Sequence, residues 1–265
     1  MKGFIYDFGQ GKSWADFSGD YNPIHFDLNA AAALNQTALI VHGMRVIADI
    51  KRDTLPKDGC RKNKPPVTVR FSARFENPVL CGVVYSLCSH KNNQKVVFKL
   101  IEPSCESIHI RGSVSEAYAP QITHIISEKK LTKQHIDEVN KLWPVEIEKS
   151  GIIFLPLVMF RELFKNPELF RTNLLHECPH VLSLGELLAE KKVMQTHYDL
   201  YYNTPLPDIN KKSVDGMIIR TGKPSVIGSN DYGWLIQIQS AVKTGSTTLM
   251  QISVTLKIIS ESQEK

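Results

Sequence analysis

The sequence is poor in cysteine, and its cysteines follow no paired pattern. Five cysteines occur in 265 residues, and none belongs to a Cys-x-x-Cys pair. An odd number without regular spacing argues against a disulfide framework and fits a reducing compartment. The segment HECPH, with His176, Cys178 and His180, contains residue types that bind zinc, but no second Cys/His pair stands at zinc-finger spacing. We therefore expect a loop there, and neither a metal nor another cofactor.

Long apolar segments are also missing. No run of 18 apolar residues occurs, so no membrane-spanning helix is predicted. The segment MKGFIYDFGQGK lacks the apolar core of a signal peptide, and SESQEK carries no peroxisomal address. We expect a cytoplasmic protein. Hydrophobic residues make up 42% of the chain, which is ordinary for a globular protein with a buried core.

The sequence also lacks a large net charge of either sign. The net charge of +5 is too small to predict nucleic-acid binding, although it suits a partner that carries phosphates or acidic groups. Two interpretations of one basic cluster stay open: a solvated loop after a helix, or a patch that contacts phosphates or an acidic carrier protein. Its members are Lys51, Arg52, Lys57, Arg61, Lys62 and Lys64.

The periodicity of the first half predicts one helix followed by a sheet. Apolar residues recur at helical spacing from Val41 to about Leu55, and Pro56 and Gly59 follow as breakers. The period then changes to two. Four strands are expected, in residues 67–80, 79–90, 95–103 and 105–120, with GFIYDF as a short strand at the start. Short turns between them predict an antiparallel sheet, hence an α+β unit.

The second half repeats this order without repeating the residues. Residues 155–170 are apolar at helical spacing, and residues 233–242 and 248–259 are typical of a hairpin of long strands. A rise in charge after Pro120 marks the transition. We predict two α+β units, residues 1–120 and 121–265, each a long helix packed on an antiparallel sheet.

Polar residues gather in the stretch SGDYNPIH. Asp20 and His25 have the side chains needed to move protons to and from a water molecule, and Asn22 offers both a donor and an acceptor. Gly43 stands at the predicted helix start, where an unpaired N–H can polarise a carbonyl. The alternative is an Asn-Pro turn in which Asp20 only caps the chain. Residue types alone do not decide between these readings.

The order and spacing of these residues resemble the signature of a known family. SGDYNPIH followed by HGM is similar to the motif of MaoC-like proteins, which are (R)-specific enoyl-CoA hydratases and 3-hydroxyacyl dehydratases of the hot-dog fold. The resemblance covers Phe17–Met44, and the helix and strands up to about Tyr118 fit a hot-dog unit. It implies reversible hydration of trans-2-enoyl thioesters carried by CoA or an acyl-carrier protein, without a metal.

The resemblance also implies roles for individual residues. Asp20 and His25 would form the catalytic dyad around one water molecule, and Gly43 would donate its N–H to the thioester oxygen. Asn22 would orient the dyad or the water. Supporting positions are Ser18 and His42.

The sequence departs from the family pattern after HGM. Arg45 stands where the family more often has an apolar residue, so it is expected either to face the acyl tunnel or to point outward to a phosphate. Val83 replaces an aspartate that is common in related proteins. The expected activity is that of a hydro-lyase. A non-catalytic acyl-binding subunit and a thioesterase remain as alternatives.

The second half contains no Asp-x-Asn-Pro-x-His motif. The expectation is therefore a double hot-dog with a degenerate second unit and one active site per chain, as a monomeric pseudo-dimer or a homodimer. Two uses are open for the second unit. It would hide a strand edge by pairing with the first, or it would widen the tunnel with apolar side chains from residues 154–160.

Overall fold

The structure is a computed structural model that describes residues 2–55, 67–169, 181, 183–206, 214–230 and 233–259. The helical elements are α1 (Phe8–Ser18), η1 (Pro23–His25), α2 (Leu28–Ala32), α3 (Gly43–Thr54), α4 (Lys133–Lys141), α5 (Gly151–Phe164), η2 (Pro167–Leu169) and α6 (Leu184–Glu190). The strands are β1 (Lys2–Ile5), β2 (Val67–Phe75), β3 (Val84–Asn92), β4 (Lys95–Glu102), β5 (Ser107–Glu116), β6 (Ile125–Lys130), β7 (Val193–Thr204), β8 (Ile218–Gly222), β9 (Ser225–Asn230), β10 (Gly233–Thr244) and β11 (Thr247–Ile259).

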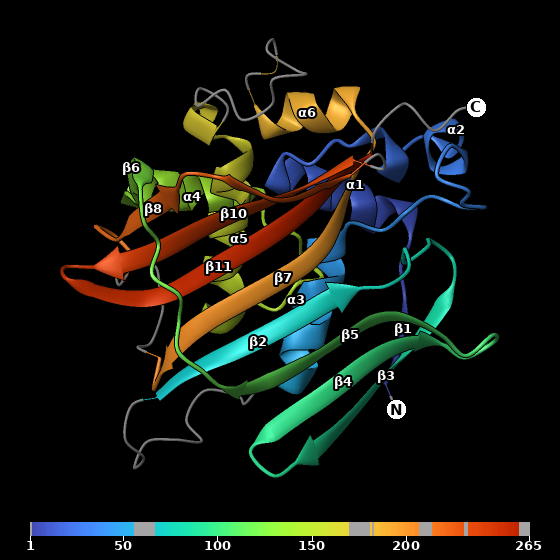
Figure 1. Cartoon of the computed structure of the whole chain (residues 1–265), viewed down its shortest axis with the longest axis horizontal. Coiled ribbons are helices and arrows are strands. Elements are labelled where there is room, and N and C mark those ends of the chain that lie inside the picture. The colour runs from blue at the N-terminus through green and yellow to red at the C-terminus, as the bar shows by residue number, and fades with distance from the viewer. Residues whose placement is uncertain are drawn as a thin grey trace.

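All these strands belong to one antiparallel sheet, in the order β1-β3-β4-β5-β2-β7-β11-β10-β8-β6, with β9 paired to β10. The two halves of the chain therefore occupy the two halves of the sheet, as Figure 1 shows. They meet where β2 pairs with β7, from Val67 opposite Thr204 to Arg74 opposite His197. This is the edge-to-edge pairing expected of two fused units. The predicted boundary at residue 120 falls between β5 and β6 and stays a prediction.

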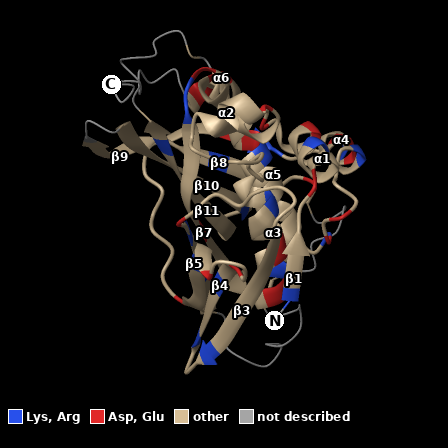
Figure 2. Cartoon of the chain, turned by 90° about the vertical axis from the view of Figure 1, so that its right-hand side faces the viewer, with Lys and Arg blue, Asp and Glu red and all other residues tan. Residues whose placement is uncertain are grey.

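The helices cover one face of the sheet. Figure 2 shows α3 and α5 lying side by side against the strands. Every residue of α5 from Ile152 to Phe164 is buried, because the helix also packs against α1, α6, β10 and β11. A helix that is apolar on all sides is stable only when it is enclosed in this way. None of the described helices is long and apolar enough to cross a membrane.

The predicted elements of the first half are confirmed with small shifts. The central helix begins at Gly43 instead of Val41, and the four strands become β2 to β5. The short strand expected in GFIYDF is present as β1, whereas the helix from Phe8 to Ser18 was not predicted. The Asp7 side chain caps this helix by accepting from Gln10 N at 2.8 Å. Two glycines near its start lower the helix propensity of this segment, so the sequence pattern does not indicate α1.

The predicted helix and hairpin of the second half are confirmed as α5, β10 and β11. The basic cluster is not a uniform surface patch. Lys51 is fully buried, and Arg52 forms ion pairs with Asp49 and Asp53 at 2.9 and 3.4 Å. The other four members of that cluster, and the HECPH segment, lie outside the described residues.

Candidate active site

The loop between α1 and η1 holds Asp20 by its backbone. Helix α1 ends at Gly19, whose left-handed φ of 83° turns the chain. The Asp20 N–H donates to Ser18 Oγ at 3.1 Å, and the Asp20 carbonyl oxygen accepts from His42 Nε2 at 3.0 Å. Ser18 and His42, both predicted as supporting residues, therefore fix the two polar backbone groups of Asp20.

His25 is buried at the end of the short helix η1. The Asn22 side chain starts this helix by accepting from Ile24 N at 3.3 Å. His25 Nδ1 lies 2.7 Å from the carbonyl oxygen of Ile40 and can only donate to it. In the neutral ring the lone pair is therefore on Nε2, which lies 3.8 Å from Asp20 Oδ2. That separation is too long for a direct hydrogen bond and leaves room for one water molecule in contact with both groups.

Burial shifts the acid–base properties of both groups. It raises the pKa of Asp20, although the neighbouring His25 and the Asn22 N–H act in the opposite direction. Burial lowers the pKa of His25, opposed by the charge of Asp20 and by the Ile40 carbonyl. The two pKa values therefore move toward each other. The pKa of His42 lies well below its usual range because of burial and of the stacked His25 ring, so His42 is neutral.

Gly43 occupies the first turn of α3, next to the dyad. His42, the residue before it, provides no side-chain cap. Within the described residues the Gly43 N–H has no hydrogen-bond acceptor. A helix start of this kind offers a donor and the positive end of the helix dipole. Asp20, Asn22, His25 and Gly43 line one cavity of about 250 Å³, so the structure brings these four predicted residues together.

The other walls of this cavity are mostly apolar, and many come from the second unit. Phe75, Val79 and Ile40 belong to the first unit. The contributions of the second unit include Phe160, Leu163, Phe164, Leu188, Val193 and Leu256. Phe160 lies within the apolar stretch that was expected to line a tunnel. A cavity with apolar walls and a few polar groups at one place is typical of a small-molecule site.

The second unit also contacts the loop that carries Asp20. Asn22 Nδ2 donates to the carbonyl oxygen of Val193 at 3.1 Å, which joins the loop to the start of β7. The Arg161 guanidinium, on α5, donates to the carbonyl oxygen of Phe17 in the last turn of α1. Both donors are buried, so these contacts define how the loop sits on the second unit.

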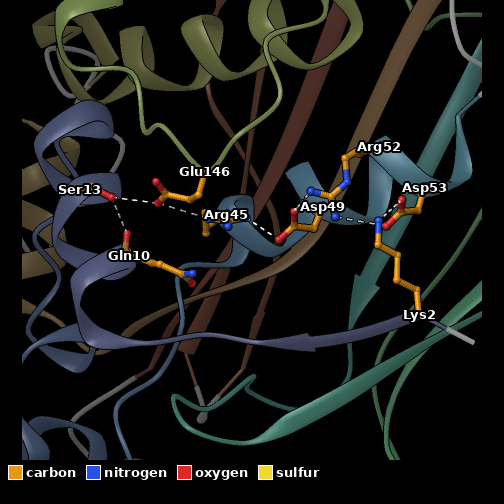
Figure 3. A network of polar contacts seen from close by, with 8 residues as sticks. All are labelled: Lys2, Gln10, Ser13, Arg45, Asp49, Arg52, Asp53 and Glu146. Atoms are coloured by element: carbon orange, nitrogen blue, oxygen red, sulfur yellow. Dashed lines mark hydrogen bonds and ion pairs between the residues drawn. The ribbon is translucent and has the colours of Figure 1, made fainter.

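Arg45 takes neither of the two orientations expected from the sequence. It does not line the cavity, and it is buried instead of pointing outward. Its Nη1 lies 2.5 Å from Asp49 Oδ2, and its Nε lies 4.0 Å from Glu146 Oε1. Glu146 also accepts from Ser13 Oγ at 3.0 Å. Figure 3 shows this network, which connects α1, α3 and the segment before α5.

Asp20, His25 and His42 also have the residue types of a metal site, since their ligand atoms lie within 4.8 Å of one another. The two imidazole rings are stacked, with centroids 3.7 Å apart and planes 28° from parallel. Histidines bind a metal through lone pairs in the ring plane that converge on one point. Stacked rings direct these lone pairs side by side, so the arrangement suits proton transfer better than metal binding.

Comparison with known proteins identifies a family for part of the chain. Residues 10–111 match the family model described as "MaoC like domain", a segment that contains the dyad and Gly43. Residues 10–111 therefore form a MaoC-like domain. No curated protein matches the chain.

Solved structures resemble this chain over both of its halves. A Mycobacterium tuberculosis protein described as having a double hotdog fold is 10% identical, with 97% of this chain and 94% of that chain covered and a TM-score of 0.51. A MaoC domain dehydratase of Chloroflexus aurantiacus is 9% identical, with 98% and 94% covered and a TM-score of 0.50. These likenesses show the fold, a double hot-dog.

Proposed function

We propose that this MaoC-like protein is a hydro-lyase that adds water reversibly to trans-2-enoyl thioesters and yields (R)-3-hydroxyacyl thioesters. One observation carries the proposal. His25 Nε2 and the Asp20 carboxylate lie 3.8 Å apart in the same cavity as Gly43, whose N–H is open. Two proton acceptors beside a carbonyl-binding donor are the groups that this reaction needs.

The reaction balances with these groups alone. A water molecule held by His25 and Asp20 gives a proton to the pair while its oxygen forms a bond to C3 of the substrate. The C2–C3 π electrons move toward the thioester, and negative charge develops on the carbonyl oxygen beside the Gly43 N–H. The pair then returns the proton to C2. The reverse sequence is dehydration.

The cavity supports an acyl group as the bound part of the substrate. Its walls are apolar away from the dyad, as an acyl chain requires. We infer that the carrier is CoA or an acyl-carrier protein, both of which present the thioester at the end of a long flexible arm.

The test follows the absorbance of the enoyl thioester over a range of acyl lengths, with CoA and carrier-protein substrates side by side. We expect hydration by the wild type, and a loss of about 10³-fold in kcat for Asp20→Asn and for His25→Ala. Matched controls are Asp27→Asn, which retains a helix cap at an exposed position, and His90→Ala on the surface. Retained hydration in both dyad variants would remove the dyad from the mechanism.

The same assay separates the alternatives. Release of free thiol from a saturated acyl-CoA, without hydration of any enoyl thioester, would assign a thioesterase. Acyl-thioester binding with neither reaction would assign a binding subunit.

A further inference from the structure

Gln195 is a polar side chain in the wall of the cavity, and an irregularity of β7 places it there. Tyr198, Leu200 and Tyr202 alternate along the buried face of this strand. The register with β11 then shifts, and Thr196 has no residue opposite it on β11. Such a bulge moves the following side chains to the opposite face. Gln195 consequently points toward the cavity instead of away from it.

The Gln195 amide lies directly against the start of α3. A Cβ atom built on Gly43 would stand 2.8 Å from Gln195 Oε1 and 3.0 Å from Phe75 Cε1. Real Cβ atoms essentially never show contacts as short as 2.8 Å, so a larger residue at position 43 would push the end of the Gln195 side chain aside. The side-chain amide and the open N–H of Gly43 therefore border the same small volume of the cavity.

This amide has no strong partner in the described part of the chain. Its Nε2 contacts Met44 Sδ at 3.4 Å, and a thioether sulfur is a weak acceptor. A half-turn of the amide exchanges its two ends and brings the NH2 group beside Gly43. A polar group in an apolar wall is costly unless it is hydrogen-bonded, so a ligand oxygen at this position would stabilise it.

We propose that Gln195, a residue of the second unit, is the second hydrogen-bond donor to the thioester carbonyl oxygen. The proposal rests on the proposed function, and it gives the unit without the motif a residue that contacts the substrate. As the water oxygen bonds to C3, the carbonyl oxygen takes up the displaced electron pair. The Gly43 N–H and the Gln195 NH2 then stabilise that charge together, as the two donors of an oxyanion hole do.

Kinetics of two substitutions test the donor. Gln195→Leu removes both polar groups, and we expect kcat to fall about 10²-fold with a change in KM of less than about threefold. Gln195→Glu keeps the shape but places a negative acceptor beside the developing charge, so its loss should be larger. The matched control is Gln251→Leu, on the neighbouring strand β11 and outside the cavity, where Gln251 is 4% exposed. Its kcat should match that of the wild type.

Binding measurements by calorimetry separate a role at the carbonyl from one in packing. A saturated acyl-CoA has the thioester carbonyl, and the corresponding S-alkyl thioether lacks it. Gln195→Leu should weaken binding of the thioester about fivefold, the value of one neutral hydrogen bond, and leave binding of the thioether within twofold. Equal weakening of both ligands, or no weakening of either, would overturn the proposal.

The kinetic and the binding measurements together also distinguish failure of this proposal from failure of the proposed function. If the wild type hydrates no enoyl thioester but the difference between thioester and thioether persists, the hydro-lyase assignment fails and the role of Gln195 stands. If hydration occurs and Gln195→Leu matches the wild type in kcat and in binding, only the role of Gln195 fails.

Discussion

The central helices of the two units begin alike and differ in what surrounds them. Each starts at a glycine, Gly43 in α3 and Gly151 in α5. The loop with Asp20 and His25 lies beside the first of these starts, whereas Ser150 precedes the second and no similar pair lies near it in the sequence. Helix α3 carries five charged residues, whereas α5 carries two and is buried from Ile152 to Phe164.

This difference indicates which parts of the cavity each unit provides. The first unit supplies the proposed proton-transferring dyad, and the second supplies most of the apolar wall of the cavity. The second unit also contacts each part of the site. Arg161 binds the end of α1, the Val193 carbonyl binds Asn22, and Gln195 lies against Gly43. The unit without the motif is therefore part of the candidate active site.

The largest effect should follow from closing the volume between the units. In Gly43→Ala the added methyl group would displace the end of the Gln195 side chain and press against the Phe75 ring, where the thioester oxygen is proposed to bind. We expect kcat/KM to fall about 10² to 10³-fold, as for loss of an oxyanion-hole donor. Gly185→Ala is the control, because its methyl group would meet only ordinary contacts near the start of α6. Unchanged kinetics of Gly43→Ala would contradict this model of the site.

A second prediction removes the connection between α5 and α1. Arg161→Met abolishes the hydrogen bond to the Phe17 carbonyl and leaves the buried Glu162 with fewer positive neighbours. The free energy of unfolding should fall by about 2–4 kcal/mol, measured by urea denaturation. Arg220→Met breaks a partly exposed ion pair with Glu128 at 2.6 Å and should cost less than about 1 kcal/mol. Equal losses in the two variants would show that the buried Arg161 contact contributes no more to the free energy of unfolding than a partly exposed ion pair does.

Much of this fold could be predicted from local periodicity. Alternation in residues 67–120 indicates the strands of the first unit, and an apolar helix followed by a long hairpin indicates the second. Elements whose local pattern conflicts with the fold were not predictable. Helix α1 contains Gly9 and Gly11 near its start, so capping by Asp7 and packing on α5 determine it more than helix propensity does.

The candidate site was predictable only where it is continuous in sequence. Asp20, His25 and Gly43 lie within one stretch whose order and spacing carry the signal. Gln195 is more than 150 residues away, and the bulge at Thr196 breaks the alternation that would have indicated its side of the strand. The orientation of Arg45 was also hidden, because Glu146 approaches it only in the folded chain.

A third prediction concerns Lys51, which lies between the units. Its Nζ is buried without a hydrogen-bond partner among the described residues and lies 5.6 Å from the Tyr198 ring on β7. Burial lowers its pKa from 10.5 to about 7. Between these pH values the unfolded chain binds a proton that the folded chain lacks, so this residue destabilises the fold increasingly as the pH falls from 10.5 to 7.

Replacing Lys51 should therefore stabilise the protein. We expect Lys51→Met to raise the free energy of unfolding by about 2 kcal/mol at pH 7, because the methionine needs no partner. The gain should shrink when urea denaturation is repeated near pH 10. A gain that does not depend on pH would mean that packing, and not the buried amine, is responsible.

The smallest effect is expected in the pH profile, where the second unit acts on the dyad through burial. The proposed mechanism needs Asp20 and His25 unprotonated, so activity is present at high pH and is lost as the pH falls through their pKa values. Because burial lowers the pKa of His25 from 6.5, kcat/KM should be nearly flat between pH 7 and 8 and should decline only below 6.5.

Phe164→Ala opens the wall of the cavity next to Gly19 and admits water to the pair. The pKa of His25 should then return toward its ordinary value. The acid limb of the kcat/KM profile, where activity falls at low pH, should move to higher pH by less than about one unit. Tyr118→Ala, at a position that is 98% exposed, should leave the limb in place. A limb that does not move in Phe164→Ala, or that moves to lower pH, would show that the wall of the second unit does not control the solvation of the dyad.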